Sequence, residues 1–125
     1  MQVLRNENPW AVDIDDTLLL WDVPLSEDIQ CVDITDPLTK GNIRVAINEN
    51  NLRLMKEKKA RGHAIILWSQ GGPEYVEAVA IALGITDIVD IAIGKPVGII
   101  DDLPCTAWLP ASVNIAYTKN YKRSR

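Results

Sequence analysis

The sequence predicts an α/β fold built on a doubly wound, mostly parallel (Rossmann-like) sheet. Helices are expected on both faces, with a small β-hairpin inserted after the first strand. Three apolar runs, over residues 9–15, 64–69 and 97–102, end in polar side chains. Segments of helical character alternate with them, which is typical of parallel sheets. Because the carboxyl ends of such strands open into ligand sites, we expect these polar residues to converge.

Length and composition predict one domain over residues 1–125. Of the 125 residues, 47% are hydrophobic, which is enough for one core, and the net charge of −4 predicts no general attraction to nucleic acid or to an anionic membrane. The first eight residues lack the apolar segment of a secretory signal, and no apolar run approaches the roughly 20 residues of a membrane span. We therefore expect a soluble, cytoplasmic protein without a membrane partner.

The first strand, over residues 9–15, leads into the segment Asp-Ile-Asp-Asp-Thr at 13–17. Residues two apart on a strand point to the same side, so we expect Asp13 and Asp15 to face one side together. Two such carboxylates can act as a nucleophile and as a general acid and base. Their mutual repulsion favours a bound cation, and Mg²⁺ prefers oxygen ligands. An acidic turn without chemistry is the alternative.

The middle of the chain predicts a hairpin and then a helix. Alternating residues over 29–47, interrupted by turn residues at 36–41, indicate two antiparallel strands. Asn48 can cap a helix that continues to Arg61 and stops at Gly62.

The run over residues 64–69 predicts a strand buried on both faces that ends at Ser69. Pro73 suits the first turn of a helix that continues to Leu83. Ser69 and the following Gln70-Gly71 then lie near a helix N-terminus, where backbone N–H groups favour an anion.

The remaining segments predict further strands. Residues 85–94 are apolar and β-branched, and residues 97–102 form a strand-like run that ends in Asp101 and Asp102. A last strand is expected near residues 113–116, before a basic tail.

These segments resemble the motifs of the haloacid dehalogenase superfamily of phosphatases and phosphotransferases. The family has an Asp-x-Asp-x-Thr segment after its first strand, a strand ending in Ser or Thr, a lysine, and a strand ending in paired acids. In the family's order, these motifs match Asp13, Asp15 and Thr17, then Ser69, then Lys95, and then Asp101 and Asp102.

The resemblance implies a Mg²⁺-dependent phosphomonoester hydrolase. Asp13 would attack phosphorus to form an aspartyl-phosphate, and Asp15 would protonate the leaving oxygen and then activate water. Mg²⁺ would be held by Asp13, the backbone carbonyl of Asp15, and Asp101, with Asp102 in the outer shell.

The resemblance also implies a set of residues around the phosphoryl group. Ser69 would hold its oxygens, Thr17 would fix the motif loop, and Lys95 would supply a positive charge. Gln70 and Gly71 complete the expected phosphate-binding set at the helix N-terminus.

The position of Lys95 leaves three alternatives open. If residues 97–101 form a straight strand at about 3.3 Å per residue, Lys95 starts roughly 20 Å from the acidic tip. Either the preceding segment loops back toward the site, or another cation such as Lys40 substitutes, or Lys95 is structural.

The short segments between the motifs leave no room for a cap domain. Capless members of this family act on macromolecular or bulky phosphoesters, or close their site by oligomerising, so a homo-oligomer is among the expectations. Trp21 either lines the entrance and stacks on a base or sugar, or packs under the hairpin.

Other functions remain open at this point. The expected partner is a phosphorylated substrate, either a small molecule or a macromolecular phosphoester. A nucleic-acid end phosphatase is one alternative, and a receiver-like or degenerate phosphate-binding domain without turnover is another.

Overall fold

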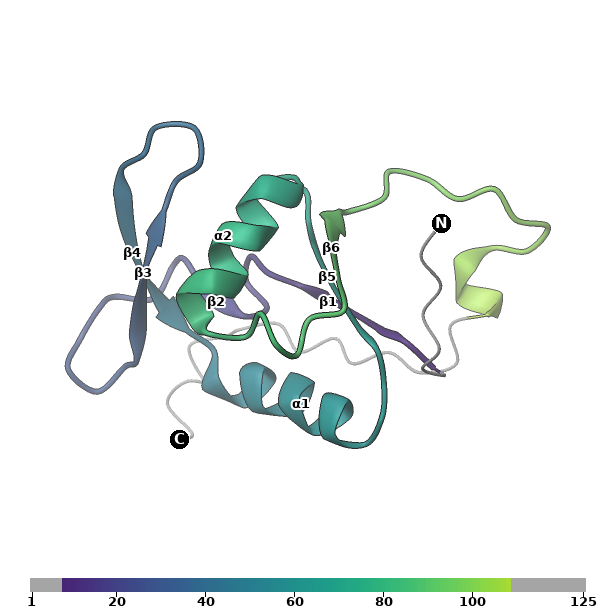
Figure 1. The fold of residues 1–125 in the computed structure, drawn as a ribbon, viewed down its shortest axis with the longest axis horizontal. Helices are drawn as coiled ribbons and strands as arrows, with labels where there is room; N and C mark the ends of the chain where they lie inside the picture. The colour runs from purple at the N-terminus through teal and green to yellow at the C-terminus, as the bar shows by residue number, and fades with distance from the viewer. Residues whose placement is uncertain (1–7, 109–125) are drawn as a thin grey trace.

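The computed structural model describes residues 8–108 and confirms the α/β class (Figure 1). A parallel sheet has the strand order β1 (Trp10–Asp13), β5 (Ile65–Ser69), β6 (Ile91–Gly94). An antiparallel sheet has the order β2 (Leu19–Leu20), β4 (Asn42–Ile47), β3 (Cys31–Thr35). The helices are α1 (Glu49–Ala60), α2 (Pro73–Leu83) and the short 3₁₀ helix η1 (Cys105–Ala107).

The register of the parallel sheet brings three strand ends to one edge. β5 is the central strand, with Trp68 aligned to Asp13 of β1 and Ser69 aligned to Gly94 of β6. Because the three strands run in the same direction, the residues that follow each strand begin at the same edge of the sheet. Side chains that lie far apart in the sequence are therefore close together at this edge.

Both helices pack on one face of the parallel sheet, so the expected second layer of helices is not found within residues 8–108. Leu67 of β5 is fully buried in one core cluster with Met55 of α1 and Val76 of α2, whereas its neighbour Trp68 is only half-buried. The chain crosses from β1 to β5 to β6 in one direction, and right-handed crossovers in one direction place their helices on the same face. The prediction that β5 is buried on both faces is therefore wrong.

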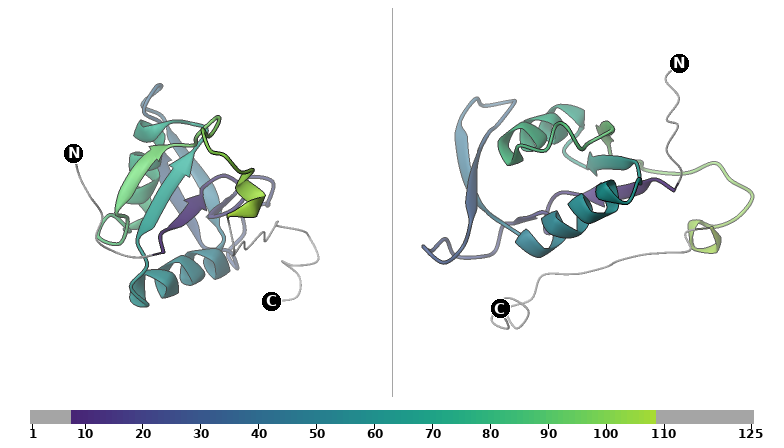
Figure 2. Two further views of the ribbon diagram at one scale, coloured as in Figure 1. Left: turned by 90° about the vertical axis from the view of Figure 1, so that its right-hand side faces the viewer. Right: turned by 60° about the horizontal axis from the view of Figure 1, so that its bottom comes forward.

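The strand expected over residues 97–102 does not form. Val97 and Ile100 are fully exposed, and the segment after β6 leads away from the antiparallel sheet (Figures 1 and 2). Pro96 lacks an N–H for a ladder, and Gly98 weakens a strand interior, which opposes pairing here. Within the described range, β1 has a neighbour on one side only, so the strand order does not reverse as a doubly wound sheet requires. The strand expected at 113–116 lies outside the described residues.

The predicted hairpin is confirmed, and the structure adds a third strand to it. β3 and β4 pair in antiparallel register with Cys31 opposite Ala46, and β2 pairs with the other edge of β4 through Leu19 and Leu20. Both leucines are buried. The antiparallel sheet stands at one end of the parallel strands and η1 lies beyond the other end (Figure 2).

The helix boundaries follow the predicted signals. The Asn48 side chain accepts a hydrogen bond from the Asn51 N–H at 3.2 Å and so caps α1. Pro73 opens α2, and Gly84 ends it in the left-handed conformation with φ of 68°. Among the described helices, none is long and apolar enough to cross a bilayer.

Asp90 connects α1 to the central strand. Its carboxylate accepts the Ile65 N–H at 2.7 Å and lies 3.0 Å from the Lys59 ammonium. Partial burial raises the pKa of Asp90, but the Ile65 N–H and the Lys59 charge lower it by more, so the pKa lies below its usual value.

We expect Asp90→Asn to lower the free energy of unfolding by about 1 kcal/mol at pH 7. Because the folded-state pKa is depressed, this contribution is present above the unfolded-state pKa near 4 and is lost as the pH falls through the folded-state value. Urea unfolding of wild type and variant at pH 7 and pH 3 measures the difference, with the exposed Asp87→Asn as control. A difference that does not shrink at low pH contradicts this account.

Candidate functional site

Asp13 lies at the end of β1 with a cation and a hydroxyl beside it. The Lys95 ammonium is 3.8 Å from Asp13 Oδ1, and the Thr17 hydroxyl donates to Asp13 Oδ2 at 3.2 Å. The Asp13 side chain is 31% exposed, so a ligand can reach it. The structure thus brings the first-motif acid and the candidate lysine together.

Lys95 reaches Asp13 because it follows β6 directly. The distance of roughly 20 Å at 3.3 Å per residue assumed a strand over 97–101, but the strand of this region is Ile91–Gly94 and its end lies at the common edge. The Lys95 N–H also donates to the Ser69 carbonyl at 2.8 Å, which fixes its backbone there. Of the three alternatives, the geometry leaves no need for Lys40 as a substitute.

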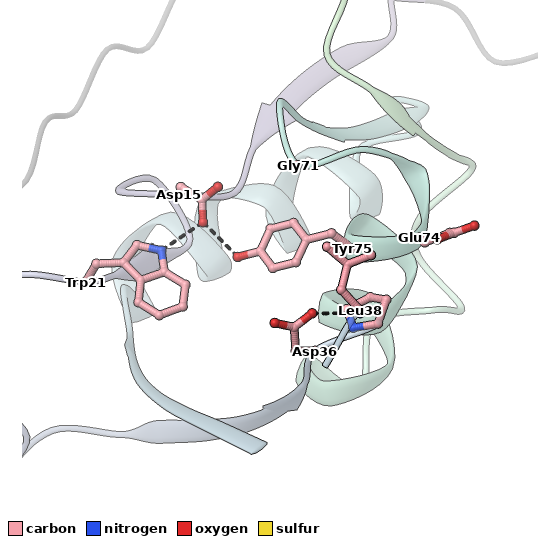
Figure 3. Close-up of a pocket in the computed structure, with 8 residues that line it drawn as sticks. Asp15, Trp21, Asp36, Leu38, Gly71, Glu74 and Tyr75 are labelled. Atoms are coloured by element: carbon pink, nitrogen blue, oxygen red, sulfur yellow. Dashed lines mark hydrogen bonds between the residues drawn. The ribbon is translucent and has the colours of Figure 1, made fainter. Parts of the chain in front are cut away.

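The carboxylate of Asp15 is held by three donors. The Tyr75 hydroxyl and the Trp21 indole N–H both donate to Oδ1, at 2.7 and 2.8 Å (Figure 3). The Ser69 hydroxyl donates to Oδ2 at 3.3 Å. These donors come from α2, the segment after the motif, and β5, so Asp15 joins three parts of the fold at one point.

Tyr75 remains a proton donor over the whole physiological range. Its burial raises the pKa of the phenol strongly, and the hydrogen bond to Asp15 and the negative charges of Asp15 and Asp13 raise it further. Ionised tyrosine would face two carboxylates, so the neutral hydroxyl is the form that fits here.

Ser69 is fully buried, and its hydroxyl is already engaged. The oxygen accepts the Gly71 N–H at 3.0 Å while its proton points to Asp15. Gly71 is required by a close approach, because a Cβ at this position would lie 2.8 Å from the Tyr75 ring. The expected phosphate-binding set is therefore divided: Ser69 and Gly71 shape the surroundings of Asp15, and Gln70 is exposed beside them.

Hydrogen bonds within the loop between Asp13 and β2, and one from α1, hold this loop in place. The Ile14 carbonyl accepts three backbone N–H groups, and Asp16 adopts φ of 61° to make the tight turn. The buried Asn51 side chain donates to the Thr17 carbonyl at 2.9 Å. This role of Asn51 was not predicted, although its position in the first turn after a predicted cap placed it near the strand ends.

The role of Tyr75 was not predicted either, because a tyrosine within a helical segment carries no motif of its own. Its place in the first turn of α2, directly after the Gly-Gly-Pro segment at 71–73, was the available signal. Because α2 begins close to the end of β5, a side chain in the first turn of α2 lies near the strand ends, as Ser69 does.

The described residues do not fit a Mg²⁺ site as they are placed. Asp101 and Asp102 are exposed on the segment after β6, where Asp101 accepts the Leu103 N–H. Both oxygens of Asp15 already accept hydrogen bonds, and Asp13 faces Lys95. No group of three or more His, Cys, Asp or Glu side chains in the range 8–108 is arranged to hold a metal ion. The expected convergence of the third acidic segment is thus not found.

A cavity of about 370 Å³ opens beside Asp15 (Figure 3). Its lining residues come from the motif side, the hairpin turn and the start of α2: Asp15, Trp21, residues 36–38, Gly71, Glu74 and Tyr75. Of the two alternatives for Trp21, this geometry favours the entrance, since the indole is 40% exposed and lines the cavity.

Comparisons with known proteins add no assignment. No family model matches this chain, and searches of curated proteins and of solved structures find no match.

We expect Tyr75→Phe to lower the free energy of unfolding by about 1 kcal/mol at pH 7, since a partly buried donor to Asp15 is lost. The pKa of Tyr75 is raised in the folded state, so its contribution is present below the usual tyrosine value near 10 and is lost as the pH rises above it. Urea unfolding at pH 7 and pH 10.5 measures the difference between wild type and variant. An equal difference at both pH values contradicts the role of this hydroxyl.

Proposed function

We propose that this protein is a phosphomonoester hydrolase of the haloacid dehalogenase type, with Asp13 as nucleophile. The observation that carries the proposal is the approach of Lys95 to Asp13 at the strand edge where Asp15 is also held. A partly exposed carboxylate beside an ammonium suits attack on a phosphoryl group, whose negative charge the ammonium neutralises.

The proposed reaction has two steps. An oxygen of Asp13 attacks phosphorus, the bond from phosphorus to the leaving oxygen breaks, and that oxygen takes a proton from Asp15. Water then gives a proton to Asp15 and attacks the aspartyl-phosphate, which releases inorganic phosphate and restores Asp13. Tyr75 and Trp21 share Oδ1 of Asp15, so we assign proton transfer to Oδ2, whose one contact is Ser69 at 3.3 Å.

The Mg²⁺ site is a finer proposal that depends on the segment after Lys95. Val97, Ile99 and Ile100 are exposed there, as are Asp101 and Asp102. A strand over 97–101 beside β1 would take Lys95 roughly 20 Å from the acidic tip and break its contact with Asp13, so we propose that the segment folds back toward the edge as a loop in the Mg²⁺-bound protein. Asp13, the Asp15 carbonyl and Asp101 would then hold Mg²⁺, with Asp102 in the outer shell.

We expect Asp13→Asn to reduce phosphate release by at least about 10³-fold, because it removes the nucleophile. The assay is phosphate release from sugar phosphates, nucleotides, phosphorylated oligonucleotides and phosphopeptides, with Mg²⁺ present. Asp16→Asn is the matched control: the side chain is exposed, asparagine tolerates its φ of 61°, and activity should stay within about twofold.

Two results contradict the proposal, and a third identifies its substrate. Absence of turnover on every ester, with Asp13→Asn identical to wild type, excludes the hydrolase. A stable aspartyl-phosphate without release indicates the receiver-like alternative. Selective release from oligonucleotide ends, lost when residues 119–125 are removed, indicates the nucleic-acid alternative.

We expect Mg²⁺ with inorganic phosphate to slow hydrogen exchange at the amides of residues 97–101, because folding back against the strand edge would shield them from water. Chelator should remove both this protection and phosphate release, and Asp101→Asn should weaken both. Release that persists in chelator, with unchanged exchange over 97–101, contradicts the Mg²⁺ site while leaving Asp13 as nucleophile.

A further inference from the structure

We infer that the cavity beside Asp15 receives the leaving group of the phosphoester, and that this leaving group carries a positive charge such as a protonated amine. The presence of a leaving group depends on the proposed function, whereas the charge of that group is inferred from the residues that line the cavity. Asp15 belongs to the cavity lining and is the group that protonates the leaving oxygen. The atoms beyond that oxygen therefore enter this space.

Charge is the first argument. Asp15, Asp36 and Glu74 line the cavity, and none of the described lining residues is lysine, arginine or histidine. The Asp36 carboxylate lies below the Tyr75 ring and across from Trp21, whereas Glu74 is directed outward (Figure 3). A leaving group with further phosphates or carboxylates would meet these acids without a compensating cation, and like charges in such positions are costly.

Asp36 is fixed as an anion at the cavity floor. Its Oδ1 accepts the Leu38 N–H at 2.8 Å. This bond, with smaller contributions from Thr39 and the Lys40 charge, holds the pKa of Asp36 below its usual value. Lys40 is two residues from the lining turn and does not itself line the cavity, whereas Asp36 does.

The aromatic walls are the second argument. Trp21 and Tyr75 use their N–H and O–H groups on Asp15, and both residues also line the cavity, so their aromatic rings form part of its wall. Ring faces attract cations, and an aromatic wall next to a carboxylate is the arrangement that recognises ammonium groups. A volume of about 370 Å³ is at the small end for ligand pockets and suits one ring or a short chain rather than a polymer.

The test compares esters that differ in charge. Glucosamine 6-phosphate carries an ammonium group on its sugar ring. Glucose 6-phosphate and N-acetylglucosamine 6-phosphate have no charge apart from the phosphate, and 6-phosphogluconate carries an added carboxylate. We expect kcat/KM for the ammonium ester to exceed that for the neutral esters by about five- to tenfold, with the carboxylate ester slowest. The preference should weaken in high salt.

Asp36→Asn should reduce the ratio of kcat/KM for glucosamine 6-phosphate to that for glucose 6-phosphate to about one, because it removes the charge while asparagine keeps the Oδ1 acceptor for Leu38. Glu77→Gln, an equal loss of charge on α2 outside the cavity lining, should leave the preference unchanged. Preference that is equal in Asp36→Asn and wild type, or that favours the carboxylate ester, overturns the inference.

Binding to Asp13→Asn separates failure of the inference from failure of the proposed function. Calorimetry with this variant should show tighter binding of glucosamine 6-phosphate than of glucose 6-phosphate. If no ester is hydrolysed by wild type but this order holds, the cavity assignment stands and the hydrolase proposal fails. If esters are hydrolysed and neither rate nor binding follows charge, the cavity assignment fails alone.

Discussion

The arrangement of the candidate site depends on one carboxylate. Asp15 is the acceptor for Tyr75, Trp21 and Ser69, which come from three separate parts of the chain. A carboxylate with three donors is fixed in position, because moving it would leave the buried Ser69 hydroxyl without its partner. The cavity exists beside it since the same two aromatic residues that hold Asp15 also form the cavity walls.

Local sequence signals predicted the elements of the fold better than their arrangement. The Asn48 cap, the Gly62 and Gly84 stops and the hairpin turn at 36–41 each act over a few residues, and the structure has all of them. The apolar run over 97–102 has the composition of a strand but lacks a partner in the described residues, since pairing is a non-local property. Which face of the sheet each helix covers likewise depends on the strand order. Residue patterns along the chain do not reveal that order.

The same distinction holds for the site. Asp13, Asp15 and Ser69 could be predicted because strand ends share an edge whatever the strand order, and Lys95 shares it for the same reason. Tyr75 and Asp36 could not, because their relevance arises from the way α2 and the hairpin turn face one another across the cavity. Ser69 reaches the expected place, yet its hydroxyl serves a neighbouring carboxylate, a detail that only side-chain directions reveal.

The contact of Asn51 with the Thr17 carbonyl couples a helix end to the loop after β1. Asn48 adds a second connection, since its N–H donates to the Leu18 carbonyl while its side chain caps α1. Fraying of the first turn of α1 would remove both contacts from the loop that follows Asp13, so we expect the helix end and the loop to open together. The position of the Asp13 carboxylate thus depends in part on a helix that does not itself line the cavity.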